Sequence, residues 1–97
     1  MKKKIIHPVF FQDNYGKEHV IAETQNMEEV FAAIRDFCSD REYKIHYTRF
    51  WLEPYSIDEC PNAYKMVFDV GSWSEFFNIY FDNEKQANDF RDTFEIK

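Results

Sequence analysis

The segment DVGSWSEFFNIYFD, residues 69–82, decides the fold because it joins a turn to a strand with apolar side chains on both faces. Five of its fourteen residues are aromatic. Gly71 favours a tight turn, and residues 73–81 then alternate as a strand does. One side of this strand carries the apolar residues Trp73, Phe77, Ile79 and Phe81. Only Glu75 interrupts that side, so we expect it to face the core.

The opposite side of the same strand is unusual because Phe76 and Tyr80 stand where a solvated face would carry polar residues. Alternation along residues 43–52 adds Phe50 to this back face. We take Phe50, Phe76 and Tyr80 as a candidate protein-binding surface, since interfaces are enriched in aromatic residues. Two alternatives remain open: the N-terminal hairpin or the loop at 53–62 covers the face, or the aromatics are singly exposed.

Two helices flank these strands. Apolar residues recur at helical spacing over 27–39, and Asn26 followed by Glu29 fits a capping box. The second helix begins after Asp82 or Asn83 and has a narrower apolar stripe. Its inward residues are Ala87, Phe90 and Phe94.

The remaining strands complete an α+β fold with the order ββαβββα. Residues 4–11 and 17–23 are joined by QDNYG as a hairpin, and residues 43–52 and 64–70 alternate as further strands. We therefore expect an antiparallel sheet of four or five strands, with both helices packed on one face. Residues 1–97 are expected to form a single domain.

Composition excludes several classes of protein. Hydrophobic residues make up 44% of the chain and charged residues 31%, which is typical of a globular domain rather than a disordered one. No apolar run approaches the ~18 residues of a membrane span, so we expect no membrane contact. Two cysteines without a C-x-x-C spacing give no disulfide framework, and a cytoplasmic location is expected.

The charge is unevenly distributed along the chain. Residues 1–52 hold eight acids and eight bases, whereas residues 53–97 hold ten acids and four bases and so carry the whole net charge of −6. The final helix contributes the candidate acidic face, which consists of Glu84, Asp89, Asp92 and Glu95. Such a face favours a protein partner with a basic surface and disfavours direct contact with nucleic acid.

The residues capable of chemistry do not form a recognisable motif. His7 and His19 could approach each other across the first hairpin, but their spacing does not indicate a zinc site. Acidic neighbours of Cys60 disfavour a reactive nucleophile there, and Cys38 closes the apolar helix stripe. No Gly-rich phosphate loop and no Ser–His–Asp spacing is present. We expect no cofactor, no metal and no enzymatic activity.

Two resemblances bear on function. The order αβββα over residues 26–95 is similar to the double-stranded-RNA-binding domain in topology alone, because DNEKQAND stands where that family has a lysine cluster. In size, charge and composition the chain resembles acidic phage and mobile-element inhibitors of nucleic-acid enzymes, including anti-CRISPR and DNA-mimic proteins. We therefore expect a protein-binding module. The alternatives are a homodimer that uses the aromatic face and an uncharacterised enzyme.

Overall fold

The computed structural model describes residues 6–41, 49–71 and 75–94, which form one antiparallel sheet and two helices. The strands are β1 (His7–Gln12), β2 (Glu18–Thr24), β3 (Arg49–Pro54), β4 (Tyr64–Asp69) and β5 (Phe76–Phe81). The helices are α1 (Met27–Asp40), between β2 and β3, and α2 (Glu84–Asp92), after β5. The expected α+β fold and element order are confirmed, with five strands in the described part of the chain.

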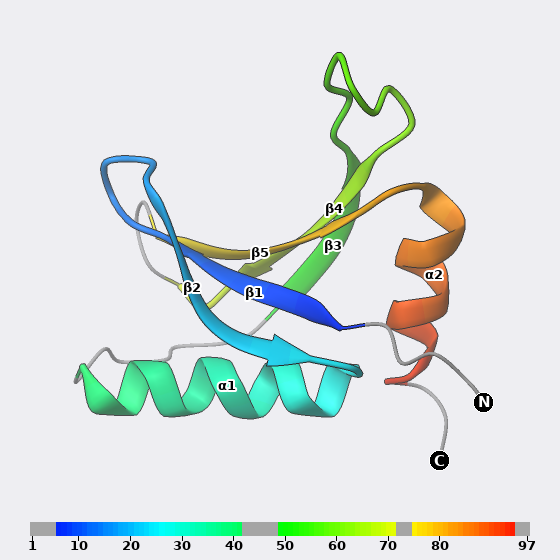
Figure 1. Ribbon diagram of the computed structural model, residues 1–97. Coiled ribbons are helices and arrows are strands. Elements are labelled where there is room, and N and C mark those ends of the chain that lie inside the picture. The colour runs from blue at the N-terminus through cyan, green and yellow to red at the C-terminus, as the bar shows by residue number, and fades with distance from the viewer. Residues whose placement is uncertain (1–5, 42–48, 72–74, 95–97) are drawn as a thin grey trace.

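The strands lie in the order β2-β1-β5-β4-β3. β5, the last strand along the chain, is therefore the central strand of the sheet. All four pairings are antiparallel. The N-terminal hairpin joins the C-terminal half through the contact of β1 with β5, where Phe11 pairs with Phe77. Figure 1 shows α1 lying along β2 and β1 on one side of the sheet, with α2 beyond the end of β5.

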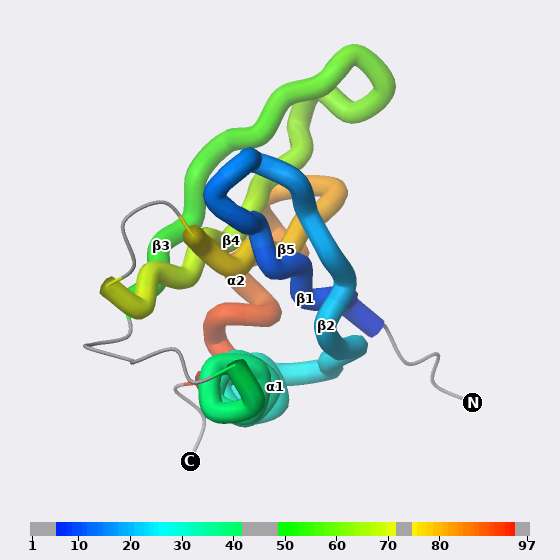
Figure 2. Tube along the Cα trace, turned by 90° about the vertical axis from the view of Figure 1, so that its left-hand side faces the viewer, coloured from blue at the N-terminus to red at the C-terminus, as the bar shows by residue number. Residues whose placement is uncertain are grey.

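Both helices pack their apolar stripes into a single core. The buried residues of α1 are Met27, Val30, Ile34, Phe37 and Cys38, and those of α2 are Ala87 and Phe90. They meet the expected side of β5, where Phe77, Ile79 and Phe81 are buried. Figure 2 looks along α1 and shows that the helix lies under the sheet. Burial of this apolar surface is the main force that stabilises the arrangement.

The two helices begin with the same N-terminal capping arrangement. The Asn26 side chain accepts a hydrogen bond from the Glu29 amide, and the Glu29 carboxylate in turn accepts one from the Gln25 amide at 2.7 Å. In α2, Asn83 accepts from the Gln86 amide, and the Gln86 side chain accepts from the amide of residue 82. These bonds satisfy amides that have no partner inside the helix, and so they fix where each helix starts.

Phe50 corrects the expected composition of the back face. In the register of β3 with β4 it pairs with Phe68, on the side of the sheet that faces the helices. Its ring lies 5.9 Å from that of Phe31 and 5.6 Å from that of Phe68, so Phe50 belongs to the edge of the core. Alternation shows which residues share a side but not which side faces the helices. Trp51, together with Arg49 and Glu53 at alternate positions of β3, occupies the back face instead.

Candidate binding surfaces

The candidate acids of α2 are partly balanced by bases on the same helix. Lys85 donates to Asp89 at 2.8 Å, and Arg91 lies 3.5 Å from Asp92. Glu84 is exposed in the first turn, and Glu95 lies outside the described residues. Three acids and two bases leave α2 with a net charge of −1. The binding role of these acids therefore stays a prediction, with less unbalanced charge than the sequence count implies.

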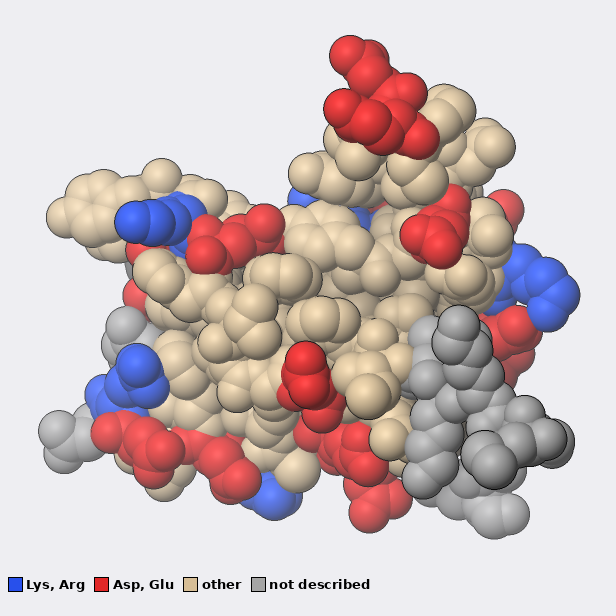
Figure 3. Space-filling view, in the orientation of Figure 1, with Lys and Arg blue, Asp and Glu red and all other residues tan. Residues whose placement is uncertain are grey.

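A denser group of acids lies between α1 and β2. An open groove of about 720 Å³ lies between the two elements, and the acidic residues that contribute to its lining are Glu23, Glu29, Asp36 and Asp40. All four residues are exposed. Figure 3 shows acidic side chains gathered over α1 on this face of the molecule. We call this feature the acidic groove.

Helical spacing explains how the acids align. Residues 29, 33, 36 and 40 follow one another at intervals of four, three and four, which places them in a row along one side of a helix. Ala33 occupies the second place in this row, and Ala32 lies beside it, so the floor of the groove stays low and apolar. The net charge of each half of the sequence did not indicate this row, because lysines elsewhere in the first half offset the negative charge of these acids in the sum.

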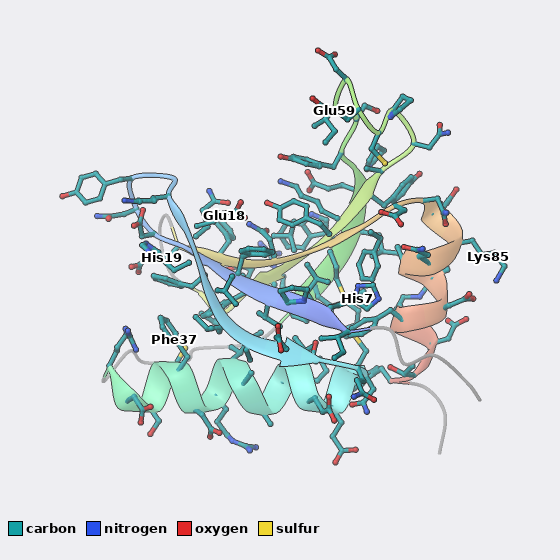
Figure 4. The ribbon with its side chains drawn as sticks, viewed as in Figure 1. His7, Glu18, His19, Phe37, Glu59 and Lys85 are labelled. Carbon is teal, nitrogen blue, oxygen red and sulfur yellow. The ribbon has the colours of Figure 1, made fainter. Side chains whose placement is uncertain are left out.

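The acidic groove has a net charge of −3, from four acids and one base, Arg41. The Arg41 guanidinium lies over the Phe37 ring at 4.0 Å, and Figure 4 shows Phe37 between α1 and the sheet. No three acids, histidines or cysteines in the described residues converge closely enough to hold a metal ion. The acids are thus distributed along the groove, which suits several cationic side chains in succession rather than one metal ion.

The back face of the sheet is a second candidate surface. Figure 1 shows the β1–β2 hairpin and the β3–β4 loop rising on either side of β5, on the side away from α1, and Figure 3 shows a hollow between them. We call this the concave face. Tyr80 and Phe76 lie on it as expected, both half-buried. The Tyr80 ring packs against Phe10 at 5.5 Å and against Tyr55 at 4.9 Å.

A polar network occupies the floor of the concave face. Asn78, only 1% exposed, donates to Gln12 at 2.9 Å and to the Glu18 carboxylate at 3.0 Å, and the Tyr80 hydroxyl also donates to Glu18. Burial, together with the neighbouring Glu18 carboxylate, raises the pKa of Tyr80. Figure 4 shows Glu18 on this side of the sheet. The hairpin therefore covers part of the face, as one of the open alternatives expected, and Tyr55 covers another part.

Exposed hydrophobic residues are present on the segments that border the concave face. The large ones are Tyr15 and Val20 on the hairpin, Trp51 on β3, and Tyr55 and Ile57 on the β3–β4 loop. Among the described residues, Ile6 and Phe94 are the other large hydrophobics with comparable exposure. Five of the seven exposed large hydrophobics among the described residues therefore lie on segments that border the concave face, with Val20 and Trp51 on opposite edges of the sheet.

The two histidines among the described residues, which could act in catalysis or bind a metal ion, do not lie together. His7 pairs with Thr24 and His19 with Phe11, so the two histidines lie toward opposite ends of the hairpin. The His7 ring packs on Phe81 at 4.8 Å, and burial lowers its pKa. His19 is hydrogen-bonded to Asp13 at 2.9 Å, and this bond lowers the pKa of the Asp13 carboxyl.

The two cysteines are likewise apart from these groups. Cys38 is buried in the core, and burial raises its pKa. Cys60 is half-buried, and its Sγ lies 3.4 Å from the carbonyl oxygen of Asp82. In the described residues neither helix is long and apolar enough to span a bilayer. Comparisons with protein families, with curated proteins and with solved structures find no match for this chain.

Proposed function

We propose that the protein is a non-enzymatic binding module that recognises a basic surface of a partner protein through the acidic groove. The row of exposed acids along α1, together with Glu23 of β2, is the observation that carries this proposal. Two bases adjoin these acids: Arg41 is placed over an aromatic ring, and the exposed Arg35 lies 3.8 Å from Asp36. Charges arranged in this way mainly accelerate association and select partners of opposite charge.

A basic cleft that holds nucleic-acid phosphates is one partner surface with the required chemistry. Occupation of such a cleft by the acidic groove would make the protein an inhibitor of a nucleic-acid enzyme. This finer proposal predicts that the protein competes with DNA or RNA for its partner. A partner that binds nucleic acid and the protein simultaneously would contradict it.

Two charge-matched variants test the site of binding. Glu23→Gln/Asp36→Asn/Asp40→Asn removes three charges from the acidic groove, and Glu84→Gln/Asp89→Asn/Asp92→Asn removes three from α2. A basic partner captured from the native cell and then purified should associate roughly tenfold more slowly with the groove variant at low salt. The α2 variant should retain the wild-type rate. The reverse result would move the site to α2, and equal rates for all three proteins would refute an electrostatic site.

Self-association through the concave face is the second candidate function. The exposed aromatic residues Trp51 and Tyr55, which border the concave face, support it, because interfaces are enriched in aromatic residues. Size-exclusion chromatography with light scattering separates a homodimer from a monomer of 11.9 kDa. A dimer that Trp51→Ser dissociates would support this function. A monomer at high protein concentration would eliminate it and leave the concave face without a role in self-association.

A further inference from the structure

We propose that the basic partner supplies an extended segment which pairs with the outer edge of β2 and becomes an additional strand of the sheet. This inference rests on the proposed function, since it concerns how the acidic groove holds its partner. Addition of a strand to a sheet edge is a recurrent mode of peptide recognition, in which main-chain hydrogen bonds supply affinity and alternate side chains supply specificity.

The position of β2 supplies the first part of the argument. β2 is at the edge of the sheet and, in the described part of the chain, pairs only with β1. An edge strand presents unpaired N–H and C=O groups along its outer side. β2 has the sequence EHVIAET, which contains neither the proline nor the lysine that commonly blocks such an edge.

A bulge determines which part of β2 is available. Val9 pairs with Ala22 and Phe10 with Val20, so Ile21 is an extra residue in β2. A bulge interrupts regular pairing and redirects the strand. The groove begins at this point: residues 21–25 line it consecutively, over a length of about 16 Å for an extended chain. The segment beyond the bulge therefore borders the acidic groove, and Figure 2 shows it at the edge of the sheet beside α1.

The acids of α1 match the geometry of an extended chain. Asp36 and Asp40 are separated by one helical turn, about 6 Å along the axis, and Glu29 lies about 10.5 Å from Asp36. Side chains on one side of a strand recur about every 6.6 Å. Lysine or arginine at alternate positions can therefore reach successive acids, while the aliphatic stems of these side chains cover Ala32 and Ala33. The occupant that the groove fits is thus an extended segment with basic residues at alternate positions.

The experiment uses the full chain and a synthetic heptapeptide in which four lysines alternate with three threonines, with both ends blocked. Two further peptides carry backbone N-methyl groups, either on the threonines or on the internal lysines. Successive N–H groups of a strand point in opposite directions, so only one of these sets can donate to β2. We expect one methylated peptide to bind roughly tenfold or more weakly than the parent and the other to bind like the parent. Within residues 21–24, the amides that point away from β1 should exchange more slowly when the parent peptide is bound.

The outcomes separate this inference from the proposed function. Equal affinities for both methylated peptides, whether reduced or not, overturn strand addition. If the groove variant still weakens binding of all three peptides, the electrostatic site stands without the additional strand. If the parent peptide fails to bind, or binds the groove variant as it binds the wild type, the acidic groove itself is refuted as the site.

Discussion

Replacing Asn78 by aspartate should convert a buried hydrogen bond into a repulsion between two carboxylates. Asn78 is 1% exposed, and its Nδ2 donates to the Glu18 carboxylate at 3.0 Å and to Gln12 at 2.9 Å. Aspartate has nearly the same shape but offers no donor when it is ionised. The variant therefore tests the polar network of the concave face without opening a cavity.

The magnitude follows from the cost of ionising the introduced carboxyl. Burial and a like charge at hydrogen-bond distance together raise a carboxyl pKa by roughly 2–4 units, which corresponds to about 3–5 kcal/mol at neutral pH. In a domain of this size that loss lowers the melting temperature by roughly 12 °C or more. Because the pKa is raised in the folded state, the penalty is complete above the folded pKa, decreases as the pH falls below it, and vanishes only below the unfolded value of about 3.9. The variant should approach the wild type in stability between pH 8 and pH 5.

Thermal unfolding followed by circular dichroism from pH 5 to pH 8 measures this effect. Asn78→Ala is the control, because it removes the same donor without adding a charge. It should cost about 1–3 kcal/mol at every pH in this range. If Asn78→Asp and Asn78→Ala melt together and show the same pH dependence, the Glu18 carboxylate is not paired with Asn78 in the folded protein, and the reasoning fails.

Ile34→Ala, in the buried stripe of α1, should lower the free energy of unfolding in urea by about 2–5 kcal/mol. The exposed control Glu28→Ala should change it by about 0.5 kcal/mol or less. Equal unfolding midpoints for the two variants would show that Ile34 does not belong to the core. The lowered pKa of His7 means that the unfolded chain binds the additional proton, so stability should decrease as the pH falls below about 6.5, and His7→Gln should flatten that part of the pH profile. An unchanged profile in the variant would assign the effect to another group. Iodoacetamide at pH 7 should label Cys60 slowly, because its thiol lies near a carbonyl oxygen, and Cys38 only after unfolding, because its thiol is buried. Rapid labelling of Cys60 would instead support a role as a nucleophile.

The acidic groove could be anticipated only in part. The row at residues 29, 36 and 40 is visible in the sequence once helical spacing is applied to charged residues as well as to apolar ones. Its neighbour Glu23 belongs to another element, and the opening between α1 and β2 exists only after β2 has taken the edge of the sheet. Counting charge along the chain favoured α2, where Lys85 and Arg91 accompany the acids.

The sequence by itself determined the elements, because their signals are local. Asn26 and Asn83 each cap a helix through bonds that span three residues, and strand alternation depends only on the next residue but one. The tertiary structure decided the strand order and which side of β3 faces the helices. Phe50 and Trp51 are both aromatic, so the pattern alone could not choose between them. Pairing with β4 made the choice, since it placed Phe50 against Phe68 and left Trp51 on the concave face.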